Sequence, residues 1–152
     1  MVDYAHEKES ITNVLQTAKN LKIAGTKTII LLGAEGGGRD KAKRSIMGEL
    51  AAKMADYVIV SNVDPYEDDP KQILEDIAIP CETFGKIRGQ NLFVIEDRRQ
   101  GIKKSLQLAK INDIILITGK GAEQSIVIDG KRLAWDDRKI VREELKFVLP
   151  ID

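Results

Sequence analysis

Apolar residues near the start of the chain recur at intervals of three to four, which is the spacing of an amphipathic helix. The positions are Ile11, Val14, Leu15, Ala18 and Leu21, and we expect this helix to end near Gly25. Residues 28–32 then form a β-branched, almost continuously apolar run, as expected for a strand covered on both faces. The chain is therefore predicted to open with a helix followed by a buried strand.

Strand-like and helix-like patterns alternate along the rest of the sequence. Strands are predicted at residues 56–60, 92–95 and 114–118, and helices at residues 40–54, from about Pro70, and at residues 97–109. Residues 80–91 contain turn-favouring residues and are predicted to form a loop. Asp129-Gly130, between residues 126–128 and 131–133, favours a tight hairpin. Asp136 or Asp137 is expected to cap a last helix that runs to about Val148.

This alternation predicts the α/β class: a Rossmann-like, doubly wound, mostly parallel sheet with helices on both faces. The hairpin would add an antiparallel pair at one edge. The 152 residues are enough for one hydrophobic core and too few for two ordinary domains.

The net charge of the chain and the length of its apolar runs limit the classes of partner that it could bind. The 24 basic and 24 acidic residues cancel, so no global field draws the chain to nucleic acid or to an anionic membrane. Runs such as residues 28–32 and 114–117 are far too short to cross a bilayer, and we expect a soluble, cytoplasmic protein. Cys81 is the single cysteine and cannot form an internal disulfide, and no metal-ligand cluster is evident.

Three unusual loops follow predicted strands, at residues 33–40, 61–69 and 119–123. In parallel sheets, ligands bind beyond the carboxyl ends of the strands. The glycines of the first loop leave backbone amides open to an anion, and Arg39 adds a planar fork suited to a carboxylate or phosphate. The alternative is a tight turn before the solvated basic face that Lys41, Lys43 and Arg44 would form.

The other two loops carry acidic groups. Glu123, in Gly119-Lys120-Gly121-Ala122-Glu123, could receive an ammonium group, or this loop could be a surface turn with incidental charges. Residues 64–69 gather carboxylates where the positive end of a zwitterion bound by Arg39 would lie. The alternative is an acidic helix start favoured by the helix dipole, which suits Asp68 and Asp69 better than Asp64.

No self-contained catalytic centre is evident in the sequence. His6 is the only histidine, no cysteine or serine has a matching base, and no GxxxxGK[ST] loop occurs. We therefore expect no catalytic residue in this chain by itself.

Six motifs in order together resemble a known family. They are Asp3-Tyr4-Ala5-His6, residues 36–44 (GGGRDKAKR), Asp64-Pro65, Asp97-Arg98-Arg99, Gly119-Lys120-Gly121-x-Glu123 and Asp136-Asp137-Arg138. From Val2 to about Leu145 the chain resembles the C-terminal domain of the Mur ligases. The resemblance is strongest to UDP-N-acetylmuramoyl-tripeptide synthetases, which add the third residue of the peptidoglycan stem peptide.

The resemblance implies that residues 1–152 form the amino-acid-binding domain of an ATP-dependent ligase of cell-wall synthesis. In such ligases ATP phosphorylates the carboxylate of a UDP-linked muramoyl dipeptide, and the amine of the incoming amino acid attacks the acyl phosphate. An N-terminal UDP-binding domain and a central ATPase domain, which binds ATP and Mg²⁺, would supply what this sequence lacks. The 152-residue chain alone is expected to be inactive.

Roles are implied residue by residue. Arg39 matches the arginine that binds the amino acid's carboxylate, and Gly119 and Glu123 match contacts to its distal amino end. Asp3 matches the ATP-ribose contact, with Tyr4 and His6 nearby. Where diaminopimelate-adding members carry Asp-Asn-Pro-Arg, this chain has Val63-Asp64-Pro65-Tyr66, so the arginine for a second carboxylate is absent. A substrate with a simple terminal amine, such as lysine, is then expected, with Asp64 and Glu123 as candidate acceptors. Alternatively, Tyr66 could hydrogen-bond the second carboxylate directly.

The sequence is also compatible with other functions. A folylpolyglutamate-type or cyanophycin-type ligase domain would use the same architecture on other acids. A stand-alone amino-acid-binding or regulatory module would need no ATP. A Rossmann oxidoreductase is suggested by the glycine loop alone and is disfavoured because GxGxxG is missing.

Overall fold

A computed structural model describes residues 1–38 and 40–148 of the chain. Its elements in chain order are β1 (Val2–Asp3), α1 (Lys8–Leu21), β2 (Thr28–Leu32), α2 (Ala42–Met54), β3 (Tyr57–Val60), α3 (Pro70–Thr83), β4 (Leu92–Val94), α4 (Arg98–Leu108), β5 (Ile114–Thr118), β6 (Ser125–Ile128), β7 (Lys131–Ala134) and α5 (Asp137–Val148).

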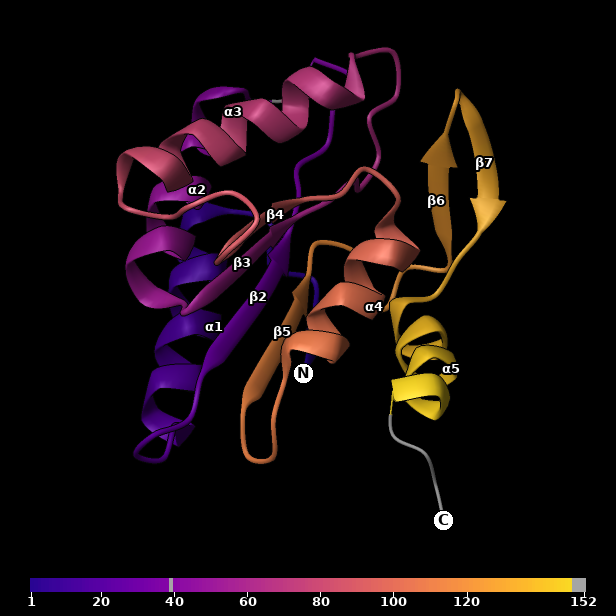
Figure 1. Cartoon of the computed structure of the whole chain (residues 1–152). Coiled ribbons are helices and arrows are strands. Elements are labelled where there is room, and N and C mark those ends of the chain that lie inside the picture. Colours follow the sequence, from indigo (N-terminus) through magenta and orange to yellow (C-terminus); the bar gives the residue numbers. More distant parts are fainter. Residues whose placement is uncertain (39, 149–152) are drawn as a thin grey trace.

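Five of the strands form one parallel sheet in the order β1-β5-β2-β3-β4 (Figure 1). β2 lies at the centre, where Ile29 is paired with Tyr57 of β3 and with Ile115 of β5. Every residue of β2 is buried, which explains why its sequence is apolar without alternation. The predicted Rossmann-like α/β fold is confirmed.

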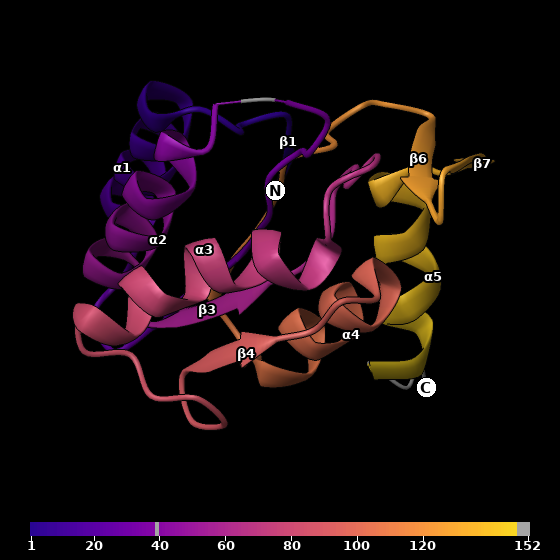
Figure 2. The ribbon, with the colours of Figure 1, turned by 90° about the horizontal axis from the view of Figure 1, so that it is seen from above.

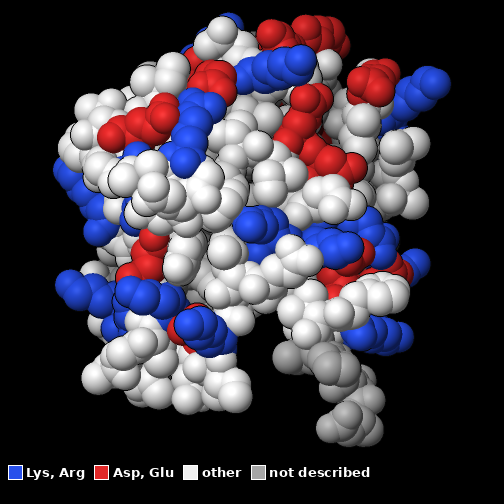
Figure 3. All heavy atoms as spheres, viewed as in Figure 1, with Lys and Arg blue, Asp and Glu red and all other residues white. Residues whose placement is uncertain are grey.

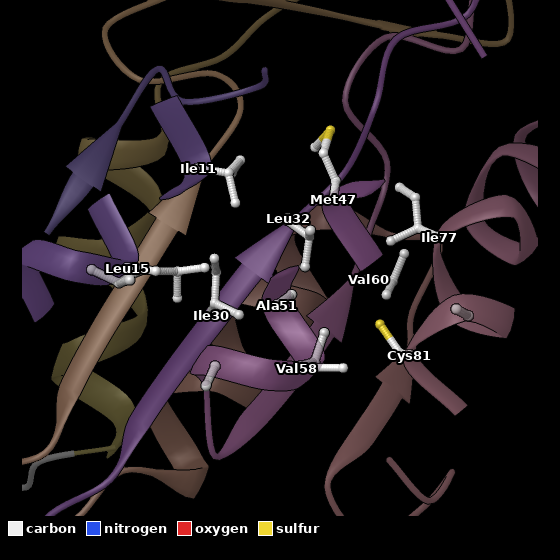
Figure 4. Packing of buried hydrophobic residues seen from close by; sticks show 14 of the residues in the cluster. Ile11, Leu15, Ile30, Leu32, Met47, Ala51, Val58, Val60, Ile77 and Cys81 are labelled. Carbon is white, nitrogen blue, oxygen red and sulfur yellow. The ribbon is translucent and has the colours of Figure 1, made fainter. Parts of the chain in front are cut away.

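Helices cover both faces of this sheet (Figure 2). α1, α2 and α3 pack on one face, where a core forms around Ile30, Leu32 and Met47 (Figure 4). α4 and α5 pack on the other face, where Ile29 and Leu31 meet the apolar sides of these two helices. Alternate residues of β2 thus enter opposite cores, as the two-residue period of a strand requires.

The hairpin differs from the prediction in its attachment. β6 and β7 are antiparallel, and Asp129 and Gly130 have positive φ angles of 49° and 69°, as predicted for a tight turn. They form a two-stranded sheet of their own and are not hydrogen-bonded to an edge of the parallel sheet. β1 was not predicted, because two residues are too short to show a periodic pattern.

The loop predicted at residues 80–91 is wrong in part, because α3 continues through Pro80 to Thr83. Proline removes a helical hydrogen bond, so packing must stabilise this end. The side chain of Cys81 lies 3.2 Å from the Gly48 carbonyl oxygen. A Cβ on Gly48 would lie only 2.2 Å from the Ile77 carbonyl oxygen. The close approach of α2 and α3 therefore extends the helix beyond its local propensity.

Charged side chains of both signs are interspersed over the face in Figure 3, with no broad patch of one sign. Among the described residues, no helix combines the length and the apolar character that a bilayer crossing requires.

Candidate functional site

The three loops singled out in the sequence lie at the carboxyl ends of β2, β3 and β5 (Figure 1). The first two are packed backbone against backbone. The N–H of Gly36 donates to the carbonyl oxygen of Asp64 at 2.8 Å. A Cβ at Gly36 would lie 1.9 Å from the Pro65 carbonyl oxygen, so glycine is required for this approach.

A buried lysine joins the second and third loops. The Lys120 side chain is 1% exposed, its Nζ lies 2.7 Å from Asp64 Oδ2, and it also forms an ion pair with Glu123. Burial alone would lower the pKa of Lys120, but hydrogen bonds and negative charge from Asp64 and Glu123 outweigh it, and the pKa is raised. Lys120 therefore stays charged and holds the two carboxylates.

This arrangement corrects the role expected for Asp64. Besides binding Lys120 through one oxygen, Asp64 accepts the Val127 N–H at 2.7 Å through the other. The carboxylate is almost fully buried, so it fixes Lys120 and β6 rather than presenting a free oxygen to a substrate amine. The Glu123 side chain is 35% exposed, and it is the acidic group of this cluster that a ligand can reach.

Tyr4 reaches Glu123 from the N-terminal segment. Its hydroxyl is within reach of the negative charge of the Glu123 carboxylate. Partial burial is the larger cause that raises the pKa of Tyr4, and the negative charge of Glu123 raises it further. Gly121 has a φ of 54°, and a Cβ there would lie 2.8 Å from the Tyr4 backbone nitrogen. The loop at residues 119–123 therefore rests directly on Tyr4.

The three residues expected to contact a nucleotide lie together, from the last residue of β1 onward. Asp3 Oδ1 accepts the Ala5 N–H at 2.8 Å, and the His6 Nδ1 lies 2.7 Å from the Tyr4 carbonyl oxygen. The rings of Tyr4 and His6 meet edge to face with centroids 4.5 Å apart, and Tyr4 is 48% exposed. An exposed and a half-buried aromatic ring beside a partly exposed carboxylate fit a base and its ribose hydroxyls.

Tyr66 lies beside the glycine loop. Its φ is 52°, a strained value for a tyrosine, and a Cβ on Gly37 would lie 3.1 Å from its ring. The half-buried ring is thus held against the loop that carries Arg39. Arg39 itself lies outside the described residues, so its predicted role as the carboxylate anchor stays a prediction.

Two of the three basic residues after the glycine loop, Lys43 and Arg44, bind groups of the protein. Arg44, 1% exposed, donates to Asp76 at 2.9 Å, to Asp68 at 3.2 Å and to the Glu35 carbonyl oxygen at 3.0 Å. Lys43 binds the carboxylate that precedes α1 at 2.6 Å. Lys43 and Arg44 are therefore buried against protein groups, and of the three basic residues in the alternative of a solvated basic face only Lys41 is exposed.

Arg98 ties three further segments together at the rim. It makes a two-pronged ion pair with Asp137, at 2.9 and 2.6 Å, in which both side chains are at most 1% exposed. It also donates to the carbonyl oxygens of Asn62 at 3.2 Å and Thr118 at 2.8 Å. The Trp135 indole donates to the same Asp137 carboxylate at 2.8 Å. α4, α5 and the ends of β3 and β5 thus share one buried guanidinium.

The structure therefore brings Tyr4, Gly119 and Glu123 into one cluster and places Tyr66 at the neighbouring glycine loop. Sequence reasoning missed Lys120 and Arg98 as site-forming residues. A lysine directly after a buried strand, with acidic residues in the adjacent loop, was the available signal for Lys120, because a buried ammonium needs carboxylate partners.

Comparison with known proteins gives the family. The family model described as "Mur ligase, glutamate ligase domain" matches residues 1–121. Over 146 residues, 96% of the chain, it is 38% identical to the UDP-N-acetylmuramoyl-L-alanyl-D-glutamate–2,6-diaminopimelate ligase of Syntrophomonas wolfei, covering 29% of that protein. The protein of the same name in Caldanaerobacter subterraneus is 40% identical over 144 residues, which are 95% of this chain and 28% of that protein.

Solved structures of similar proteins have the same fold. A structure of a ligase with this name superposes with a TM-score of 0.81 at 34% identity, over 96% of this chain and 28% of the other. A murein peptide ligase of Psychrobacter arcticus, at 20% identity and a TM-score of 0.59 over 99% of this chain and 28% of the other, shares the fold. The chain spans less than a third of the length of the curated relatives it matches. On this match, the chain belongs to the Mur ligase family, in its glutamate ligase domain.

Proposed function

We propose that this chain is the amino-acid-binding domain of an ATP-dependent ligase that adds a diamino acid to a UDP-N-acetylmuramoyl dipeptide in peptidoglycan synthesis. The names of the relatives specify a ligase acting on UDP-N-acetylmuramoyl-L-alanyl-D-glutamate and 2,6-diaminopimelate. The observation that carries the proposal here is the partly exposed Glu123 carboxylate, held at the rim by buried Lys120. It offers a fixed negative charge to an ammonium group.

In this proposal Arg39 binds the α-carboxylate of the amino acid, because a guanidinium fork matches two carboxylate oxygens. Glu123 and the backbone at Gly119 receive the distal amino end. Tyr66 contributes a neutral hydroxyl beside the glycine loop, so it can hydrogen-bond a second carboxylate without supplying a charge. The distal amine is common to lysine and 2,6-diaminopimelate, and Glu123 suits both.

Asp3, Tyr4 and His6 would contact the nucleotide when this domain closes on the rest of the ligase. ATP supplies the phosphate that activates the dipeptide carboxylate, and the preceding UDP-binding and ATPase domains would hold Mg²⁺ and the UDP-linked substrate. The residues of this chain bind and orient the amino acid. We place this activity in the cytoplasm, where ATP is available.

The proposal is tested with a hybrid ligase in which this chain replaces the matching C-terminal part of the Syntrophomonas wolfei relative. The hybrid should join an amino acid to UDP-muramoyl dipeptide and release phosphate from ATP. Lysine, 2,6-diaminopimelate and ornithine are assayed separately. If the unmodified relative is active and the folded hybrid joins none of the three, the proposed function is wrong.

A further inference from the structure

Glu123 is restrained from two directions. On one side, Lys120, the ion-pair partner of Glu123, is itself fixed by an ion pair to buried Asp64 at 2.7 Å. Beside Glu123, Tyr4 packs against Gly121 of the same loop, where a Cβ would lie 2.8 Å from the Tyr4 backbone nitrogen, and the Tyr4 hydroxyl is within reach of the Glu123 charge. The first restraint comes from the sheet rim, and the second comes from the segment that our proposal assigns to the nucleotide.

We infer that Lys120 is a positioning residue for the substrate-binding carboxylate of Glu123, and that the packing of Tyr4 against the loop that carries Gly121 and Glu123 couples amino-acid affinity to nucleotide binding. This inference rests on the proposed function and adds a regulatory link within the same site.

The charge balance supports the role of Lys120. Asp64 and Glu123 share one ammonium group, so the three side chains carry one net negative charge, which an incoming substrate ammonium would neutralise. Without Lys120 the Asp64 carboxylate would be buried beside a second carboxylate, and mutual repulsion would move Glu123 outward. Lys120 acts through Glu123 and does not touch the substrate.

Coupling follows from how closely the two segments are packed. The Gly121 backbone lies against the Tyr4 backbone, which leaves no room for a Cβ. The exposed Tyr4 ring also contacts His6, so a base that binds these rings would shift the hydroxyl relative to Glu123. Because linkage is reciprocal, an amino acid bound at Glu123 would change nucleotide affinity by the same factor.

Coupling is measured by calorimetry on the hybrid ligase, which is titrated with its preferred amino acid with and without a non-hydrolysable ATP analogue. We expect the analogue to change the amino-acid Kd by about five-fold or more, and Tyr4→Phe to remove that difference. Tyr57→Phe, at the opposite end of the sheet, is the matched control and should retain it. Coupling is excluded if the wild-type Kd changes less than about two-fold or if Tyr4→Phe retains the full effect.

Positioning is measured by steady-state kinetics of the same ligase. Lys120→Met should raise the amino-acid KM about ten-fold while turnover at saturating amino acid stays within about two-fold, whereas loss of folded protein would lower turnover alone. Lys22→Met removes another lysine with a carboxylate partner, Asp56 at 2.7 Å, at the amino ends of the strands and away from the site, and should leave the KM unchanged. An unchanged amino-acid KM in Lys120→Met would refute the positioning role of Lys120.

A third measurement needs only the 152-residue chain. Glu123→Gln removes the charge that helps to raise the pKa of Tyr4, so spectrophotometric titration should show one tyrosine ionising at lower pH, and Tyr4→Phe should remove that component. An unchanged tyrosine titration in Glu123→Gln would overturn the Tyr4–Glu123 link even if the wild-type ligase is active. Loss of wild-type ligation with a normal titration would instead contradict the proposed function.

Discussion

Replacing Arg98 with methionine tests whether the buried guanidinium holds the rim together. The substitution keeps a long apolar stem and removes both guanidinium donors to Asp137. It also leaves the Asn62 and Thr118 carbonyl oxygens without this partner. Asp137 is 0% exposed, so its charge would stay buried with the Trp135 indole as its remaining side-chain donor among the described residues.

Removing one partner of a buried ion pair costs about 3–5 kcal/mol of unfolding free energy. Domains of this size are stable by about 5–15 kcal/mol, so Arg98→Met should lose a large part of the total. In the double variant Arg98→Met/Asp137→Leu the buried charge is absent as well, and part of the loss should be recovered. Recovery should be incomplete because the two carbonyl oxygens still lack their donor.

Urea unfolding followed by the fluorescence of Trp135, the only tryptophan, reports on this cluster, and far-ultraviolet circular dichroism reports on the whole fold. Arg138→Met is the matched control, because Arg138 pairs with Asp136 at the surface, and it should change the midpoint little. A loss below about 1 kcal/mol for Arg98→Met would refute the assignment of Arg98 as the link between these loops.

Three further predictions concern other parts of the chain. Burial raises the pKa of the Cys81 thiol to about 12, so a thiol reagent should label the chain only as it unfolds, and rapid labelling of native protein at neutral pH would contradict this. Burial would raise the pKa of Asp56, but hydrogen bonds from two lysines and a backbone N–H lower it below 3.8. The stability that Asp56 adds over Asp56→Asn should therefore be constant above pH 3.8 and shrink as pH falls below it, as measured by urea midpoints; a constant difference would argue against it. Gly121→Ala should lower the free energy of unfolding by about 1–3 kcal/mol, and by more than Gly130→Ala, because Gly130 has a similar φ but open space around it. Equal losses in the two variants would contradict the contact between Gly121 and Tyr4.

The order of the main elements could be predicted because each leaves a local pattern. Residues 28–32 and 114–118 are apolar except for one terminal threonine in each, and the sheet buries β2 fully and the carboxyl-terminal part of β5. What failed depended on contacts between distant segments. α3 passes through Pro80 because Gly48 lets α2 approach, and nothing near Pro80 in the sequence shows this.

The position of the candidate site could be predicted from the sequence, but the contacts within it could not. Alternation of strands and helices places the loops after β2, β3 and β5 at one edge, so Gly119 and Glu123 could be placed at the rim. The sequence could not show that the Asp64 carboxylate pairs with Lys120, because the two residues are 56 positions apart. A carboxylate in a loop looks the same in sequence whether it faces a ligand or a buried lysine.

The central claim is that this domain captures a free amino acid by its carboxylate at Arg39. The direct measurement is the amino-acid KM of the hybrid ligase carrying Arg39→Ala, with Arg88→Ala as a control, because Arg88 pairs with Glu75 and Glu82 on the exposed surface. We expect Arg39→Ala to raise that KM by about ten-fold or more, since a hydrogen-bonded charge pair is lost, and Arg88→Ala to leave it unchanged. An Arg39→Ala ligase with unchanged KM and unchanged turnover would contradict the account.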